Sequence, residues 1–522
     1  MIKKIKFILV KFVFLKIYLY LFFNKFYPNT YAFNFKNILF NNTTHLKKIF
    51  LSDKYINEKI NDNNAFYFHS FDWLNTGKKL GGAENVRRSK KHIFNWRIKN
   101  YSKRTYIWNS NFNSKRFINI IYNYDFFAIS ATKKETDLLH SIILEHYLLI
   151  KLEIESKKIE ETTIEEYQSI LLGNLIYRNN REAIQKKIIP LLASQIDNTG
   201  FHKSYNPLRH AEFLNQIHEL KNMMLFFKIP IPKELEFQLI NMTSLLLSLT
   251  HKDKSIALFN GSSNFYKKEV NQLIEQISDI KPKNNPKIEH GLATYTDKNK
   301  KIFMDVVNPF NHIINKNLHA GTLSFELSCS NEKIITNCGS VENRMGTRPE
   351  YLRYSAAHST IILNNTNVSE LIEKKSYVRI PKNITFDTFD TENFVTWLSS
   401  HDGYIDNYKK IIKRKLHIFK NKDKIVGEDS IMSTKLKSDM ISYSIRFHLM
   451  PNISSLITND QKSILIKTPS NQKWVFKSSS KLKLENSIYI GGGKSVEQSK
   501  QIVINGNIND NKKTENWSIT KS

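Results

Sequence analysis

The sequence has 522 residues, of which 41% are hydrophobic and 12% aromatic. This length exceeds one ordinary hydrophobic core, so we expect two domains, and the composition excludes a chain that is disordered throughout. The formal net charge of +30 favours a polyanion as partner, whether nucleic acid, anionic lipid or acidic polysaccharide. The lysines are spread over the whole chain and no nucleic-acid motif stands out, so we expect no nucleic-acid partner.

Residues 1–35 form a basic and apolar N-terminal segment. A membrane-spanning helix needs about 20 predominantly apolar residues in a row. This segment has no such run, because lysines interrupt its apolar stretches. Two interpretations stay open. The segment is either an atypical export signal, for which the nearest small residue is Ala32, or an amphipathic helix on the first domain or on a membrane surface.

The apolar periodicity of residues 36–278 predicts a mostly helical domain. We expect helices at 136–154, 164–177, 181–195, 210–227 and 233–249, separated by polar or proline-containing breaks. The apolar stripe that begins with Leu138 and Leu139 is assigned to packing and not to a site.

Residues 279–287 are charged and contain Pro282 and Pro286, which indicates a linker. Short segments of alternating polarity follow over residues 288–522. They lie at 411–419, 424–429, 442–448, 464–468, 474–477, 487–490 and 502–504. This spacing predicts a sandwich of antiparallel β-strands.

The stretch from His319 to Ser328, HAGTLSFELS, is the part of the chain around which the rest is organised. Residues 322–328 alternate as a half-buried strand does, and a turn at 330–332 leads to a partner strand at 333–337. His319 would then lie at the mouth of a β-hairpin, while His358 ends a loop and opens another strand. Two histidines placed in this way could share a cleft as base, acid or metal ligand. The alternative is that both are hydrogen-bonded structural residues.

Two cysteines, Cys329 and Cys338, lie on the two strands of the expected hairpin. They could form a cross-strand disulfide. Without further cysteine pairs, however, they say little about the redox compartment.

The amino-acid sequences of three segments resemble those of a known family. HAGTLSFELS at 319–328, IITNCG at 334–339 and AAHSTIIL at 356–363 are similar to the C-terminal domain of bacterial heparinase II/III-like proteins, which are related to polysaccharide lyases. The resemblance continues in GED at 427–429 and RFHL at 446–449, and it covers roughly residues 60–518. It implies an N-terminal incomplete (α/α) toroid followed by a C-terminal antiparallel β-sandwich.

The resemblance also implies a function, a lyase that cleaves an acidic, uronate-containing polysaccharide by β-elimination. It places the protein in the cell envelope or periplasm of a bacterium, and a cytoplasmic location stays open. The alternative is a catalytically inactive protein of the same fold that binds glycans or assists polysaccharide assembly. The chain departs from the family's active pattern, because Leu175 follows Asn174, Asn317 stands where the catalytic histidine would be, and Gly321 replaces an aspartate.

A uronate lyase must neutralise the C6 carboxylate, remove the C5 proton and protonate the departing 4-oxygen. Histidine and tyrosine can move these protons, and arginine can bind a carboxylate through two hydrogen bonds. The loop 197–207 matches a family loop that borders the substrate cleft, although Asn206-Pro207 could simply start a helix. The expected catalytic residues are His319, His358 and Tyr205, and the expected substrate-binding residues are His202, Asn206, Arg344, Arg353 and His401.

One related branch binds a structural zinc ion through residues that match His319, His358 and a carboxylate near Asn337. This chain lacks the carboxylate, and an amide or threonine is a poor zinc ligand. We therefore expect no metal and no cofactor.

Overall fold

The computed structural model describes residues 47, 50–51, 67–101, 106–177, 186–277, 291–308, 318–341, 350–371, 377–435, 440–492 and 495–522. The N-terminal segment 1–35 and the expected linker 279–287 lie outside these residues. Within the described part of the chain, no helix combines the length and the apolarity that crossing a bilayer requires.

The chain divides into two compact units. The first consists of Met1–Gln195, Phe213–Leu239 and Arg344–Gly346, and the second of Ile196–Glu212, Ile240–Asn343 and Thr347–Ser522. The secondary structure changes from helix to strand between Gln276 and Gly291. Because the second unit begins at Ile196, well before this change, it contains helical segments as well as strands.

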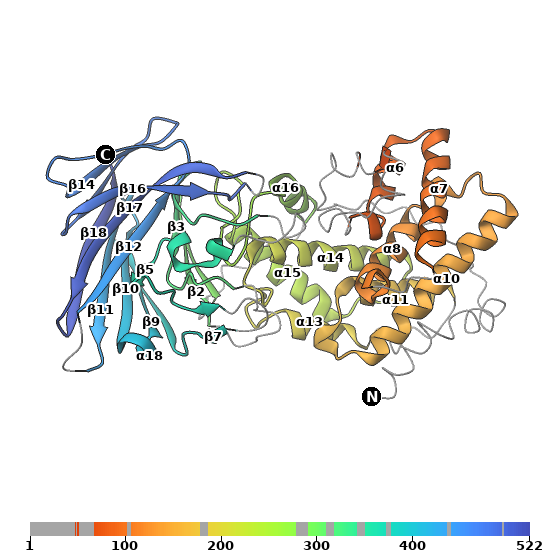
Figure 1. The fold of residues 1–522 in the computed structure, drawn as a ribbon, viewed down its shortest axis with the longest axis horizontal. Helices are drawn as coiled ribbons and strands as arrows, with labels where there is room; N and C mark the ends of the chain where they lie inside the picture. Colours follow the sequence, from red (N-terminus) through yellow and green to blue (C-terminus); the bar gives the residue numbers. More distant parts are fainter. Residues whose placement is uncertain are drawn as a thin grey trace. The chain divides into compact units, whose positions relative to one another are not determined.

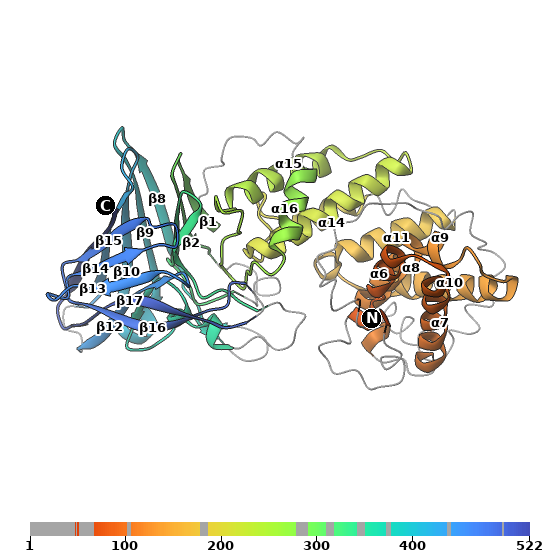
Figure 2. The ribbon, with the colours of Figure 1, turned by 90° about the horizontal axis from the view of Figure 1, so that it is seen from above.

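The first half of the described chain is helical, as Figure 2 shows. The α-helices are α6 Trp73–Leu80, α7 Ala83–Asn100, α8 Ser110–Tyr122, α9 Tyr124–Phe127, α10 Lys133–Ser156, α11 Ile164–Ile176, α13 Ile188–Gln195, α14 Pro207–Phe226, α15 Lys233–Ser248 and α16 Lys267–Gln276. Local sequence explains where several begin. A capping box formed by Thr132 and Glu135 starts α10, and the same motif from Thr163 and Glu166 starts α11.

The apolar stripe of α10 begins one residue later than the sequence suggests. Leu138 is 41% exposed, whereas Leu139, Ile142 and Ile143 are buried. Leu138 is therefore a surface residue of the second turn, and the packing face starts at Leu139.

Two large antiparallel sheets make up most of the second half of the chain (Figure 1). The first has the strand order β1-β2-β3-β4-β12-β17-β16, and β5 also pairs with β12. Its strands are β1 Gly291–Thr296, β2 Lys300–Val306, β3 Phe325–Cys329, β4 Glu332–Thr336, β5 Ile361–Leu363, β12 Ile441–Leu449, β16 Leu482–Tyr489 and β17 Glu497–Ile508.

The second sheet has the order β13-β14-β15-β18-β11-β10-β9-β8. Its strands are β8 Ile384–Asp390, β9 Phe394–Tyr404, β10 Lys410–Phe419, β11 Lys424–Ser433, β13 Ser454–Ile457, β14 Ser463–Lys467, β15 Lys473–Ser478 and β18 Lys512–Lys521. A two-stranded sheet joins β6 Glu370–Leu371 to β7 Tyr377–Arg379. The helical first half and the antiparallel second half confirm the expected fold class.

One apolar core lies between the two large sheets. It contains residues of both sheets, among them Phe325 of β3, Phe447 of β12, Phe476 of β15 and Trp517 of β18. The rings of Phe325 and Trp517 are stacked with their centroids 5.6 Å apart. This arrangement is the face-to-face packing of a β-sandwich.

The hairpin of β3 and β4 forms where the sequence predicts it, with its turn at Ser330, which has a φ of 52°. The prediction that its first strand is only half-buried is wrong, because every residue of β3 is buried. Phe325 and Leu327 face the sandwich core, while Glu326 and Ser328 bond to His251 in the segment that follows α15. Both faces of β3 are thus covered.

The two cysteines do not form a disulfide. Cys329 and Cys338 are buried free thiols, and burial raises the pKa of both.

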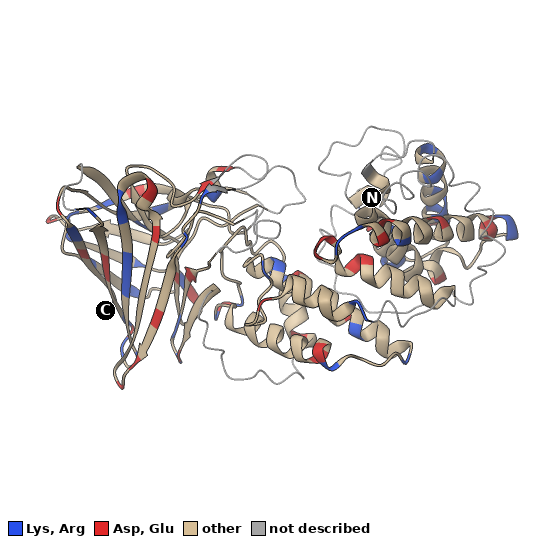
Figure 3. Cartoon of the chain, turned by 90° about the horizontal axis from the view of Figure 1, so that it is seen from below, with Lys and Arg blue, Asp and Glu red and all other residues tan. Residues whose placement is uncertain are grey.

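Basic and acidic residues are spread over helices and strands alike, as the colours in Figure 3 show. The excess of lysine is therefore a property of the whole described chain and does not by itself mark a binding surface.

Candidate functional site

The histidines identified in the sequence lie where the edge of β12 changes partner. Thr336 of β4 pairs with His448 of β12, and Ile361 of β5 pairs with Ile445 further along the same edge. The chain between β4 and β5 leaves the sheet and returns through the short helix Ser355–Ala357, directly before His358. His319 lies in the segment that leads into β3.

The structure brings these two histidines together although they are 39 residues apart in sequence. Nδ1 of His319 lies 3.2 Å from Nε2 of His358, and the two rings meet edge to face with centroids 5.3 Å apart. Both residues are buried, because His319 is 7% exposed and His358 is 3% exposed. The pair is therefore largely shielded from water.

The backbone determines which ring nitrogens carry protons. Nδ1 of His358 lies 2.8 Å from the carbonyl oxygen of Tyr354, which can only accept, so Nδ1 carries a hydrogen. Burial lowers the pKa of His358 to about 4, so at neutral pH its Nε2 has no proton and accepts from His319. His319 must then donate from Nδ1. In neutral His319 the lone pair is consequently on Nε2.

Arg353 braces the segment that holds His319. Its Nη2 donates to the carbonyl of Leu318 at 3.2 Å, and its own carbonyl accepts from the N–H of Ala320 at 2.8 Å. Arg353 therefore contacts the backbone on both sides of His319.

Asn260 connects the loop 197–207 to His319. Its Oδ1 accepts from the backbone N–H of His319 at 3.2 Å, and its Nδ2 donates to the carbonyl of Tyr205 at 3.1 Å. Nδ2 of Asn206 donates in turn to the carbonyl of Asn260 at 3.0 Å. All these residues belong to the second compact unit, so the loop and His319 share one bonded framework.

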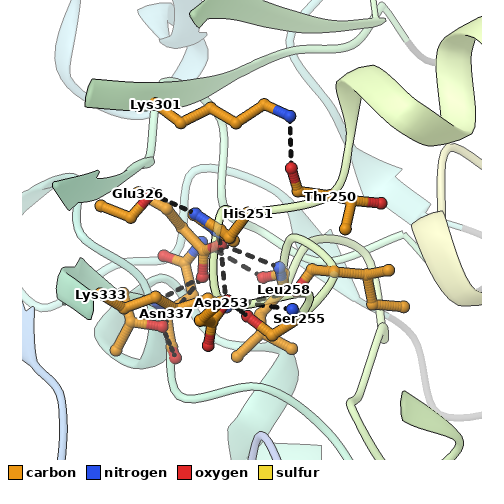
Figure 4. Close-up of polar contacts among 12 residues, drawn as sticks. Thr250, His251, Asp253, Ser255, Leu258, Lys301, Glu326, Lys333 and Asn337 are labelled. Carbon is orange, nitrogen blue, oxygen red and sulfur yellow. Dashed lines mark hydrogen bonds and ion pairs between the residues drawn. The ribbon is translucent and has the colours of Figure 1, made fainter. Parts of the chain in front are cut away.

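A buried ionic cluster holds the segment that contains Asn260 (Figure 4). Oε2 of Glu326 lies 3.0 Å from Nε2 of His251 and accepts from the N–H of Leu258 at 3.1 Å, while Oε1 accepts from Thr336 at 2.9 Å. Burial opposes ionisation of Glu326, but Lys333 and His251 hold its pKa at about 2. Burial lowers the pKa of His251 to about 4, so a neutral His251 donates to an ionised Glu326.

The other residues expected in the loop have mainly structural contacts. Tyr205 is 4% exposed within an apolar cluster and has a φ of 49°, and burial raises its pKa. Nδ1 of His202 accepts from the N–H of Ser204 at 3.2 Å, and burial lowers the pKa of His202 well below its usual value. Oδ1 of Asn206 accepts from the N–H of Arg209 at 3.0 Å and so caps α14.

Two further expected residues are not brought to the histidine pair by the described contacts. His401 lies on β9 with 1% exposure, its Nδ1 accepts from the N–H of Gly403 at 3.1 Å, and burial lowers its pKa to about 3. Arg344 lies outside the described residues.

A small hollow opens beside His319. Asn260, Asp305, Thr322, Ser369 and Pro381 are among its lining residues. Asp305 was not among the expected site residues, because a single acidic residue in the sequence of β2 belongs to no recognised motif. Burial raises the pKa of Asp305 to about 7, which makes it a titratable group near neutral pH in the same hollow as His319.

The residues present do not fit the zinc site of the related branch. Asn337 stands near the carboxylate position, and both ends of its amide are engaged, because Nδ2 donates to the carbonyl of Leu258 at 3.2 Å and Oδ1 accepts from the N–H of Ser359 at 3.0 Å. Nε2 of His358 accepts from His319 and is not directed at an ion. Among the described residues, no three His, Cys, Asp or Glu side chains are grouped as metal ligands.

Comparison with known proteins places this geometry in context. Residues 287–518 match the sequence model of the family described as "Heparinase II/III-like, C-terminal". A curated relative from Caulobacter vibrioides, "FtsZ-localized protein C", is 22% identical over 438 residues, which cover 78% of this chain and 73% of the relative.

Several solved structures share the fold over nearly the whole chain. A crystal structure of heparinase III matches with a TM-score of 0.72 at 13% identity, covering 94% of this chain and 87% of its own. Heparan sulfate lyase HepC from Pedobacter heparinus matches with a TM-score of 0.63 at 12% identity, covering 95% and 85%. Chondroitin AC lyase from Streptomyces coelicolor A3, in complex with chondroitin sulphate, matches with a TM-score of 0.56 at 6% identity, covering 94% and 81%. At these identities the likeness establishes the fold alone.

Proposed function

Because residues 287–518 match the heparinase II/III-like C-terminal family and the chain shares the fold of heparinase III, we propose that it is a polysaccharide lyase that cleaves an acidic, uronate-containing polysaccharide by β-elimination. The observation that carries the proposal is the orientation of His319 by His358. A backbone carbonyl selects the tautomer of His358, His358 selects that of His319, and Nε2 of His319 holds the lone pair of a general base.

In the proposed reaction, Nε2 of His319 removes the C5 proton of the uronate. The electron pair of the C5–H bond forms the C4–C5 double bond, and the C4–O bond breaks with its electrons on the departing oxygen. The imidazolium of His319 returns the proton to that oxygen. Tyr205, the other candidate acid, is 4% exposed, and burial together with its interaction with Asp197 raises the pKa of its hydroxyl. Arg353 and Arg344 are the proposed partners of the substrate's anionic groups.

A second function has its own support. Tyr205 and His202 are buried, and the amide of Asn206 caps a helix and bonds to Asn260. These contacts suit a protein of the same fold that binds a glycan without cleaving it, or that assists polysaccharide assembly.

Incubation with acidic polysaccharides separates the two functions. A lyase generates an unsaturated uronate that absorbs ultraviolet light, and His319→Ala should slow the increase in absorbance by about 10²–10⁴-fold. Binding of the polymer without any absorbance increase would favour the glycan-binding function.

We also propose a location in the bacterial cell envelope, where acidic polysaccharides are found. The Caulobacter relative is named for localisation with FtsZ. A fluorescent fusion of the full chain, followed by separation of cytoplasm from envelope, tests the location directly.

A further inference from the structure

Asp305 is a buried carboxyl group without a cationic partner among the described residues. It is the second-last residue of β2 and is 4% exposed. Its Oδ1 accepts from the N–H of Val307 at 3.0 Å, and no described residue donates to Oδ2. Burying a carboxylate without a compensating charge is costly, so structural residues of this kind are rare. This makes Asp305 a candidate for function.

The position of Asp305 suits contact with a ligand at His319. Both residues line the same hollow, together with Asn260, Thr322 and Ser369. The amide of Asn260 is already engaged by the N–H of His319 and the carbonyl of Tyr205. These two contacts use one of the two N–H groups of the Asn260 amide and fix its orientation. A substrate carboxylate in the hollow therefore needs a further donor to be neutralised.

Protonated Asp305 could take over this task. An O–H group that donates to a carboxylate forms a short, charge-assisted hydrogen bond. Because burial raises the pKa of Asp305 to about 7, a large share of the molecules carry this proton near neutral pH.

We propose that Asp305, in its protonated form, donates a hydrogen bond to the C6 carboxylate of a uronate residue bound at His319, and that the hollow is the carboxylate subsite. The inference rests on the proposed substrate class. The hydrogen bond draws charge from the carboxylate and so makes the C5 proton easier for His319 to remove. An ionised Asp305 repels the same carboxylate.

Most of the residues around Asp305 do not titrate. On β1 the residue paired with it is Leu292, and the segment before β3 contributes Thr322, Leu323 and His319. The chain after β7 contributes Ile380 and Pro381. His319 is thus the titratable group that shares the hollow with Asp305 among the described residues.

The test uses calorimetry to measure how tightly the full-length protein binds polyglucuronate at pH 6 and at pH 8.5. The same measurement is made with the polymer after its carboxyl groups have been reduced. Each pH unit above the pKa lowers the protonated fraction of Asp305 about tenfold, so affinity for polyglucuronate should fall at least about 10-fold between these pH values. Asp305→Asn keeps a donor at every pH and should bind equally at both. Asp305→Ala should bind weakly at both, and the reduced polymer should not discriminate among the variants.

Asp387→Asn, a change of the same kind on the exposed face of β8, is the matched control and should behave as the wild type. Melting curves of each variant establish that it is folded. An Asp305→Asn protein whose affinity still falls with pH as the wild type does would overturn the inference. So would a wild type that binds the reduced polymer equally well, or that binds neither polymer. If the predicted pattern appears but no unsaturated product forms, the subsite stands and the lyase activity fails.

Discussion

Arg414 and Asp429 form a fully buried ion pair that connects the sandwich core to the histidine site. Nε and Nη2 of Arg414 donate to the two carboxylate oxygens of Asp429 at 2.7 and 2.9 Å. Nη1 donates to the carbonyls of Leu323 and Ser359 at 2.7 and 2.8 Å. These carbonyls belong to the segments that carry His319 and His358, so a single guanidinium group ties both segments to β10.

Arg414→Lys should destabilise the protein by about 3–5 kcal/mol. An ammonium group cannot form the planar, bidentate contact of a guanidinium group, so Asp429 would be incompletely paired in the core. Urea unfolding measures the change in the free energy of unfolding. Lys420→Ala removes a solvent-exposed pair with Asp390 and is the control, for which we expect a loss of at most about 1 kcal/mol. Equal effects of the two changes would contradict the role assigned to Arg414.

His319→Ala should lower the turnover of the uronate polymer by about 10²–10⁴-fold, because one positioned general base contributes that much. The melting temperature should change little. Both quantities are measured on the same preparation. A destabilised variant with unchanged activity per folded molecule would remove His319 from the list of catalytic residues.

His358→Ala should lower turnover by about 10²-fold or more, because His319 loses the acceptor that selects its tautomer. His358→Gln offers an amide oxygen to the Nδ1–H of His319 and should restore part of the activity. The pH dependence of kcat/KM reports the base in the free enzyme, so its acidic limb should move in the alanine variant and return towards the wild-type position in the glutamine variant. If both variants lose the same activity, His358 acts in some other way.

Gly321→Ala should disturb the histidine pair without changing any titratable group. A Cβ at this position would lie 2.7 Å from Cδ2 of His358, and both nitrogens of that ring are held by hydrogen bonds. Overpacking of this kind costs about 1–3 kcal/mol, and the displaced ring should reduce turnover as His358→Ala does. At Gly492 a Cβ would lie 3.9 Å from Oε1 of Glu497, an ordinary van der Waals distance, so Gly492→Ala serves as the control. Thermal melts and initial rates of the two variants test the clash.

Asp305→Asn should stabilise the protein above pH 7. The pKa of this carboxyl group is about 3.9 in the unfolded chain, whereas burial raises its pKa in the folded protein to about 7. Between these values the folded protein binds a proton that the unfolded chain has lost, so the free energy of unfolding decreases as the pH rises from about 4 to about 7. The variant lacks this loss and should exceed the wild type by up to about 4 kcal/mol at pH 8.

The gain should disappear towards pH 4, where Asp305 is protonated in both states. Urea unfolding at several pH values measures it. A constant difference between the variant and the wild type over the whole range would show that Asp305 does not titrate on unfolding.

The sequence by itself determined the features that depend on neighbouring residues. The starts of α10 at Lys133 and of α11 at Ile164 follow from capping boxes of four residues, and the second was expected at residue 164, whereas the first was expected at residue 136. The turn between β3 and β4 follows from polar residues between two apolar runs. The segments HAGTLSFELS, IITNCG and AAHSTIIL together indicated the family and, through it, the order of a helical half and an antiparallel β half.

Only the tertiary structure decided which side chains meet. The contact between His319 and His358 depends on β4 and β5 sharing one edge of β12, a pairing that no local pattern encodes. Asp305 became a candidate only through its burial beside His319, and the full burial of β3 required the segment after α15 to cover its second face. Burial and partnership arise from residues distant in sequence, and these two properties set the pKa, the tautomer and the accessibility of a side chain.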